Sequence, residues 1–383
     1  MLVTNFLNGY WGGVTAIALA LSQQMFTLGS FNMRRYQVSD TTARYDFFDY
    51  ASSRFFTCFL MLLLGFLWAA FGKYSLDKKI AIFWLVIQKA SEAFSDVLEG
   101  QYQLQGRFDV SGRVLALKAS LSTIVFAIVL FYTRSLCYSL AAMAIIHISL
   151  FFIADLPILS KFGCLPIRFR FNKLLPLLGA CFPLAIDAYM RMYINNGPKF
   201  AIDRILDEQS TAAYTSLFMI SFVVAIFSDF IINPQIVSLS RAYHDGRRSV
   251  FHRVLLRQIC AILLFGSMGI AGAWLCGAQI LSFVFSIDLV AYRQELCILI
   301  LGGVFLALYH VAQLVLIVLR KQVWCLLPIA IGAGFVFTCS SRLVSRWMLR
   351  GGAICYCIAM IILFVLTLLL AVRFLSVPAA RKS

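Results

Sequence analysis

The sequence contains eleven stretches of about 20 mostly apolar residues, and a helix of that length crosses the hydrocarbon core of a membrane. Only 13% of the residues are charged, whereas about a quarter are charged in a typical soluble domain. We therefore predict an all-α, polytopic membrane protein, and this composition excludes soluble enzymes, nucleic-acid-binding domains and disordered chains. The predicted spans are residues 10–30, 54–72, 79–98, 114–133, 135–153, 174–197, 212–232, 255–276, 296–319, 322–340 and 352–372.

The positive charges orient these spans. With the N-terminus outside and the sides assigned alternately, 21 Lys and Arg residues fall inside and 10 fall outside. Cytoplasmic loops carry such an excess, which explains the net charge of +16 and predicts a multi-pass protein of the plasma membrane. The segment 341–351, with three arginines, fits this orientation worst. Basic residues at the predicted cytoplasmic ends, such as Arg34 and Arg35, either set the topology and bind anionic lipids or attract an anionic substrate.

A basic segment with two prolines and no long apolar run, residues 154–173, divides the chain. We predict an N-terminal helical lobe over 1–153, a cytoplasmic linker over 154–173 and a C-terminal six-helix lobe over 174–383. Five spans precede the linker and six follow it, whereas many transporters contain two equal helical repeats. The first residues, 1–8, are typical of the tail of a further helix, so we expect most of the first helix to be missing.

Four segments together resemble the Wzx-type polysaccharide (O-antigen) flippases. They are GSFNMRRYQVSD (29–40), EGQYQLQGRFDVSGR (99–113), NNGPKFAIDRILDEQSTAAYTSLFMI (195–220) and NPQIVSLSRAYHDGRRSVFHRVL (233–255). This family belongs to the multidrug/oligosaccharidyl-lipid/polysaccharide exporter superfamily. The resemblance implies twelve helices in two lobes around a central cleft. It also implies flipping of an undecaprenyl-pyrophosphate-linked oligosaccharide by alternating access, for surface polysaccharide or lipopolysaccharide export.

Span 79–98 has the densest set of charges. At about 100° per residue, Lys89, Glu92 and Asp96 share one helix face, which Glu99 and Gln103 extend toward the cytoplasmic mouth. Charged side chains are too costly to face lipid, so this face must line a cavity or meet partners. Two interpretations stay open. Lys89 contacts the pyrophosphate or moves with protonation, or it forms an ion pair with Glu92 that only fixes packing.

Span 174–197 carries a second polar face, with Asp187, Arg191 and Asn195 at four-residue spacing. Arg191 either grips a phosphate through its planar donors or neutralises Asp187 within the helix. Near the end of another span, Asp229 either is solvated at the interface or is a protonatable carboxylate coupled to transport. These residues complete the predicted substrate- or ion-binding set.

Two other functions remain open for this chain. One is an ion-coupled multidrug or lipid-precursor exporter of the same superfamily. The other is a membrane-embedded polysaccharide polymerase or acyltransferase, which the short predicted outside loops disfavour. There is no G-x-x-x-x-G-K-[ST] loop for ATP, so we expect no cofactor. The cysteines mostly lie in apolar runs, so we expect no metal. Because the enzyme is disfavoured, we also expect no enzyme activity. The expected partners are a lipid-linked oligosaccharide, anionic lipids, and the glycosyltransferases and polymerase of the same pathway.

Overall fold

The computed structural model describes residues 2–39, 45–161, 172–232, 247–319 and 321–376, and within these ranges it contains helices and no strand. The all-α prediction is thereby confirmed. The chain forms two compact units, which we call the N-terminal unit (Leu2–Met192) and the C-terminal unit (Tyr193–Ser383). Their division falls inside one long helix, α9 (Leu174–Ile205). The lobe boundaries at residues 153 and 174 remain predictions, and most of the linker lies outside the described residues.

Each of the eleven predicted spans overlaps a helix. The N-terminal unit contains α1 (Leu2–Phe6), α2 (Gly9–Ser30), α3 (Met33–Ser39), α4 (Phe47–Phe71), α5 (Leu76–Leu104), α6 (Phe108–Thr133), α7 (Leu136–Leu150), the π-helix η1 (Phe151–Asp155), α8 (Leu156–Lys161) and the first part of α9. The C-terminal unit contains the rest of α9, then α10 (Glu208–Ile232), α12 (Arg248–Gly272), the π-helix η3 (Ala273–Gly277), α13 (Ala278–Phe285), η4 (Val290–Tyr292), α14 (Arg293–Val318), η5 (Gln322–Cys325) and α15 (Leu326–Ser376).

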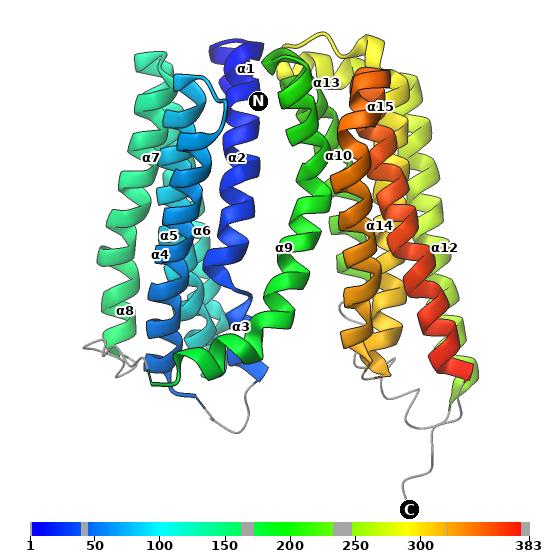
Figure 1. Ribbon diagram of the computed structural model, residues 1–383, viewed down its shortest axis with the longest axis horizontal. Helices are drawn as coiled ribbons and strands as arrows, with labels where there is room; N and C mark the ends of the chain where they lie inside the picture. Colours follow the sequence, from blue (N-terminus) through cyan, green and yellow to red (C-terminus); the bar gives the residue numbers. More distant parts are fainter. Residues whose placement is uncertain (1, 40–44, 162–171, 233–246, 320, 377–383) are drawn as a thin grey trace, which may run out of the picture. The chain divides into compact units, whose positions relative to one another are not determined.

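Within the described ranges, eight helices are long and apolar enough to cross a membrane, as a multi-pass protein requires. The longest of them, α15, has non-helical backbone angles at Trp347 and Met348. There it folds back on itself, so that its two halves run side by side (Figure 1). The first half, together with η5 before it, covers the predicted span 322–340, and the second half covers 352–372.

The central helix of the N-terminal unit is α5, which contacts α2, α3, α4, α6 and α7. It begins after Ser75, whose side-chain oxygen accepts a hydrogen bond from the backbone N–H of Lys78 at 3.4 Å and so caps the helix. Its apolar side packs Val97 and Tyr102 against Tyr50 of α4. In a membrane, apolar side chains gain little by leaving lipid, so close packing and polar contacts hold the helices together. The polar contacts of α5 therefore matter for the stability of this unit.

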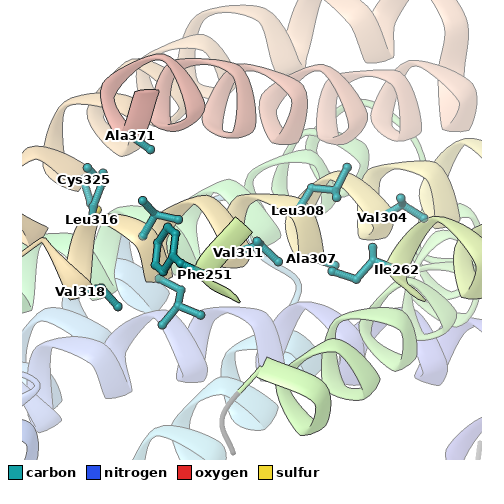
Figure 2. Packing of buried hydrophobic residues seen from close by; sticks show 12 residues of the cluster. Phe251, Ile262, Val304, Ala307, Leu308, Val311, Leu316, Val318, Cys325 and Ala371 are labelled. Carbon is teal, nitrogen blue, oxygen red and sulfur yellow. The ribbon is translucent and has the colours of Figure 1, made fainter. Parts of the chain in front are cut away.

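In the C-terminal unit the core lies between α12, α14 and α15. Figure 2 shows Phe251 of α12 beside Leu316 and Val318 of α14, in a cluster of buried apolar residues. On another side of α14, a Cβ atom added to Gly303 would lie 2.7 Å from the backbone oxygen of Ser221 on α10. Only glycine allows this approach, which is typical of membrane helices that pack through small residues.

The turn from α9 to α10 is fixed by an exposed cap. An oxygen of the Asp207 side chain accepts a hydrogen bond from the backbone N–H of Ser210 at 2.8 Å, which satisfies a free donor in the first turn of α10. Hydrogen bonds from Ser210 hold the pKa of the Asp207 carboxyl below its ordinary value. The side chain of Ser210 has the larger effect, and its backbone N–H has the smaller one.

Candidate functional site

The polar face of α5 borders a pocket of about 620 Å³ inside the N-terminal unit. Asp96 and Gln103 contribute from α5, as the predicted face requires, and the remaining walls come from α2, α3 and the turn between them. That turn follows Ser30, where Phe31 and Asn32 take the left-handed backbone conformation and let the chain leave α2 sharply. The lining residues are Phe26, Ser30, Asn32, Arg34, Arg35, Val38, Asp96 and Gln103.

Beside this pocket, two arginines share the carboxylate of Asp96. One oxygen lies 2.8 Å from a terminal nitrogen of Arg54 on α4, and the other lies 3.4 Å from a terminal nitrogen of Arg34 on α3. The same Arg34 nitrogen lies 2.6 Å from Glu99. Arg54 is 0% exposed and also donates a hydrogen bond of 2.7 Å to the carbonyl oxygen of Gly29. Because Arg54 is fully buried, the loss of its charge-assisted contacts would be costly.

The charges lining the pocket are predominantly positive. Arg34 is satisfied by Glu99 and Asp96, and the more exposed Arg35 makes no ion pair with a described residue. The guanidinium group of Arg35 is therefore available to an anion that enters the pocket, because its planar donors suit phosphate and carboxylate oxygens. The pocket combines this available cation with a neutralised network behind it.

A second network lies on another side of α5, one residue away from Asp96. Ser95 accepts a hydrogen bond of 2.6 Å from the Lys118 ammonium of α6 and donates one of 2.8 Å to Asp155 in η1. Lys118 and Asp155 also form an ion pair, and each side chain is only 2% exposed. One helical turn before Ser95, the Ser91 hydroxyl lies 3.1 Å from His147 of α7. The π-helix adds a residue to the turn that presents Asp155, a feature common at functional sites.

The first predicted ion pair of α5 is present in the structure. The Lys89 ammonium lies 2.6 Å from Glu92 and 5.5 Å from the centre of the Phe26 ring, which lines the pocket. This contact matches the interpretation in which Lys89 and Glu92 fix packing. Both side chains are partly exposed, so a role in binding stays a prediction.

The polar face of α9 also shows its internal pair, because Arg191 and Asp187 form an ion pair one turn apart. Nearby, Gln24 of α2 donates a hydrogen bond of 3.0 Å to the carbonyl oxygen of Tyr189. Asn32 similarly donates one of 3.2 Å to the carbonyl oxygen of Leu184. This part of α9 is therefore attached to the pocket wall through its backbone.

The other two predicted residues do not join these networks. Asn195 is the next residue of the same face but belongs to the C-terminal unit, where its side-chain oxygen is buried without a hydrogen-bond partner among the described residues. Asp229 falls in α10, and its side chain lies outside the described residues. The structure thus gathers Lys89, Glu92 and Asp96 on α5, and it pairs Asp187 with Arg191 on α9.

Sequence reasoning missed Arg54, Lys118 and Asp155 as site residues. Basic residues near the span ends were explained by topology and lipid binding. The sequence offered one signal for them, which is the excess of acidic over basic residues on the polar face of α5. Buried acidic groups require cations, so this excess indicates that basic residues of other helices pair with α5.

Comparisons with known proteins agree on the fold. No family model matches the sequence, and no curated protein matches it significantly. Among solved structures, an inward-facing multidrug resistance transporter of the MATE family, from the MOP superfamily, has a TM-score of 0.66 at 13% identity, covering 99% of this chain and 92% of its own. The lipid II flippase MurJ, in an inward closed conformation, has a TM-score of 0.66 at 15% identity, covering 97% and 86%. A MOP superfamily transporter from Pyrococcus furiosus has a TM-score of 0.59 at 12% identity, covering 99% and 89%.

The chain is a multi-pass membrane protein with the fold of MOP superfamily transporters. The superfamily fold implied by the resemblance of its sequence is therefore confirmed. Membership of the Wzx-type family remains a prediction. The three structures are named as transporters or flippases, and none of them is named as an enzyme.

Proposed function

We propose that this protein is a transporter that flips an undecaprenyl-pyrophosphate-linked oligosaccharide across the plasma membrane by alternating access. The observation that carries the proposal is the pocket beside α5, in which Arg35 makes no ion pair with a described residue and Arg34 is held by carboxylates. The match to the lipid II flippase MurJ supports a lipid-linked substrate. Glycosyltransferases and a polymerase of the same pathway would supply the substrate and consume the product.

The chemistry of the substrate explains why such a pocket is needed. Sugar hydroxyls and a pyrophosphate cannot cross hydrocarbon unaided, because each unpaired polar group there costs several kcal/mol. A pocket that offers arginine donors and polar side chains replaces the lost water contacts. The polyprenyl chain needs no such help and stays in lipid, so the protein must accommodate only the polar head.

A multidrug exporter is the second candidate, and one observation favours it. The MATE family structure matches as well as MurJ does, with the same TM-score of 0.66. Cationic drugs require exposed acidic groups, however. Asp96, which lines the pocket, is engaged by two arginines, and Glu99 beside the pocket is engaged by Arg34. The charges that remain available favour an anionic head group.

Complementation tests the proposal in a strain that lacks its own polysaccharide flippase. We expect the chain to restore surface polysaccharide, and we expect Arg35→Gln to reduce that rescue at unchanged abundance in the membrane. Arg107→Gln is the matched control, because Arg107 is exposed, pairs with Asp109 at 3.0 Å and lies outside the pocket. Full rescue by Arg35→Gln would remove the pocket from the mechanism. Absence of rescue together with lowered drug susceptibility would favour the multidrug exporter.

A further inference from the structure

The turn inside α15 carries three arginines that the proposed transport does not use. The helix is interrupted at Trp347 (φ −127°, ψ 16°) and Met348 (φ 50°, ψ −132°). Arg342 and Arg346 end its first half, and Arg350 opens its second half. The turn is tight, because a Cβ atom added to Gly351 would lie 2.0 Å from the backbone oxygen of Leu343. The three arginines therefore lie on either side of one compact turn.

All three arginines are exposed, and none makes an ion pair with a described residue. The sequence explains why, since Glu295 is the last acidic residue and no Asp or Glu occurs in the remaining chain. The helical hairpin therefore cannot neutralise its own charge. Neutralisation requires anions from outside the hairpin, because three like charges around one turn repel one another.

The position of the turn identifies where those anions come from. Each half of α15 exceeds the length of about 20 residues that a crossing needs, so the turn between them lies at a membrane surface. Trp347 and Met348 are 45% and 59% exposed beside the arginines, and tryptophan is enriched at membrane interfaces. The Arg346 guanidinium lies 5.6 Å from the centre of the Trp347 ring, which keeps the cation next to the side chain that enters the interface.

We propose that the α15 turn binds the head groups of anionic phospholipids, with Arg342, Arg346 and Arg350 contacting phosphates and with Trp347 and Met348 inserted beside them. A free polyanion would be attracted by the arginines alone and would gain nothing from the exposed apolar side chains. A phospholipid matches both parts of the surface. This binding is independent of the proposed substrate and anchors the end of the hairpin in one leaflet.

Fluorescence of Trp347 tests the proposal in the full chain. The other five tryptophans are replaced by phenylalanine, and the protein is placed in nanodiscs with brominated phosphatidylglycerol or brominated phosphatidylcholine. Bromine quenches tryptophan at contact, so we expect stronger quenching by the anionic lipid. Each arginine near an anionic surface contributes roughly fivefold to lipid preference. The triple variant Arg342→Gln/Arg346→Gln/Arg350→Gln should therefore lose a preference of up to about 100-fold.

Two further variants keep the result interpretable. Arg253→Gln/Arg257→Gln removes two exposed arginines of α12 and should leave the lipid preference at Trp347 unchanged. Replacing the three arginines of the turn by lysine should retain most of the preference, because the charges remain. Equal quenching by the two lipids, or a preference that survives the triple glutamine variant, would overturn the proposal. Loss of the preference on adding inorganic pyrophosphate at concentrations too low to screen charges would instead indicate a site for soluble anions.

Discussion

Replacing Lys118 by methionine should destabilise the N-terminal unit strongly, because it leaves the carboxylate of Asp155 buried without its cation. Both side chains are only 2% exposed, so water cannot take over the lost contact. Removing one partner of a buried ion pair costs about 3–5 kcal/mol. Ser95 still donates its hydrogen bond to Asp155, which places the expected cost at the lower end, about 3 kcal/mol. That cost lowers the ratio of folded to unfolded protein by about two orders of magnitude.

The double variant Lys118→Met/Asp155→Leu separates the pair from its parts. It removes both charges and fills the same space with apolar groups, a change that is often neutral or stabilising for buried pairs. We therefore expect each single variant, Lys118→Met or Asp155→Leu, to be much less stable than the double variant. Reversible unfolding in bicelles measures all four proteins, and the exposed pair Arg107–Asp109 supplies a control cycle with little coupling.

Two outcomes would refute this reasoning. One is a set of single variants as stable as the wild type, which would mean that water or another cation reaches the site. The other is a double variant whose loss equals the sum of both single losses. Complementation with the stable double variant then gives a functional answer. Retained transport assigns Lys118 and Asp155 to folding, and lost transport assigns their charges to the transport cycle.

Three further predictions concern the described contacts. Arg34→Gln should lower transport several-fold, since it removes the cation that pairs with Glu99 and one of the two that pair with Asp96, whereas Arg107→Gln should not, and a flipping assay in proteoliposomes compares them. Gly351→Ala should lower the unfolding temperature, because its Cβ atom would collide with the backbone of Leu343, as thermal unfolding in detergent can show. Asp207→Ala should cost about 1 kcal/mol of stability at pH 7. Because the folded-state pKa of Asp207 is depressed, this cost is present above its unfolded value of about 3.9 and disappears as pH falls through the lower folded value. Unfolding measured at pH 7 and below pH 3 checks both parts.

The positions of the long helices could be predicted from the sequence, because the length of an apolar run directly determines whether it can cross a membrane. Span 79–98 has the densest set of charges among the predicted spans, yet α5 is the central helix of its unit. Hydropathy counts the charges of Asp96 and its neighbours as evidence against burial. It cannot count the cations that neutralise them from other helices.

The site was harder to predict, because its partners are distant in the sequence. Arg54 and Asp96 are separated by 42 positions, and Lys118 and Asp155 by 37. No pattern in a single sequence pairs such residues. The bias of basic residues toward the cytoplasm also gave a wrong reason to leave Arg54 out of the site. In the structure α4 begins at Phe47, so Arg54 lies about two helical turns inside the helix and is buried. Contacts within one helix were accessible, as the pairs Lys89–Glu92 and Asp187–Arg191 show.

Consecutive residues of α5, Ser95 and Asp96, engage different groups of helices. Ser95 is attached to α6 and η1, while Asp96 is attached to α3 and α4. A rotation of α5 about its own axis, or a slide of one turn, would break both sets of contacts at once. Such a motion would leave the buried charges of Arg54, Lys118 and Asp155 without their partners, which is costly. The contacts of Ser95 and Asp96 therefore couple α3, α4, α6 and η1 through α5. These helices are suited to move as one rigid body rather than to slide past one another.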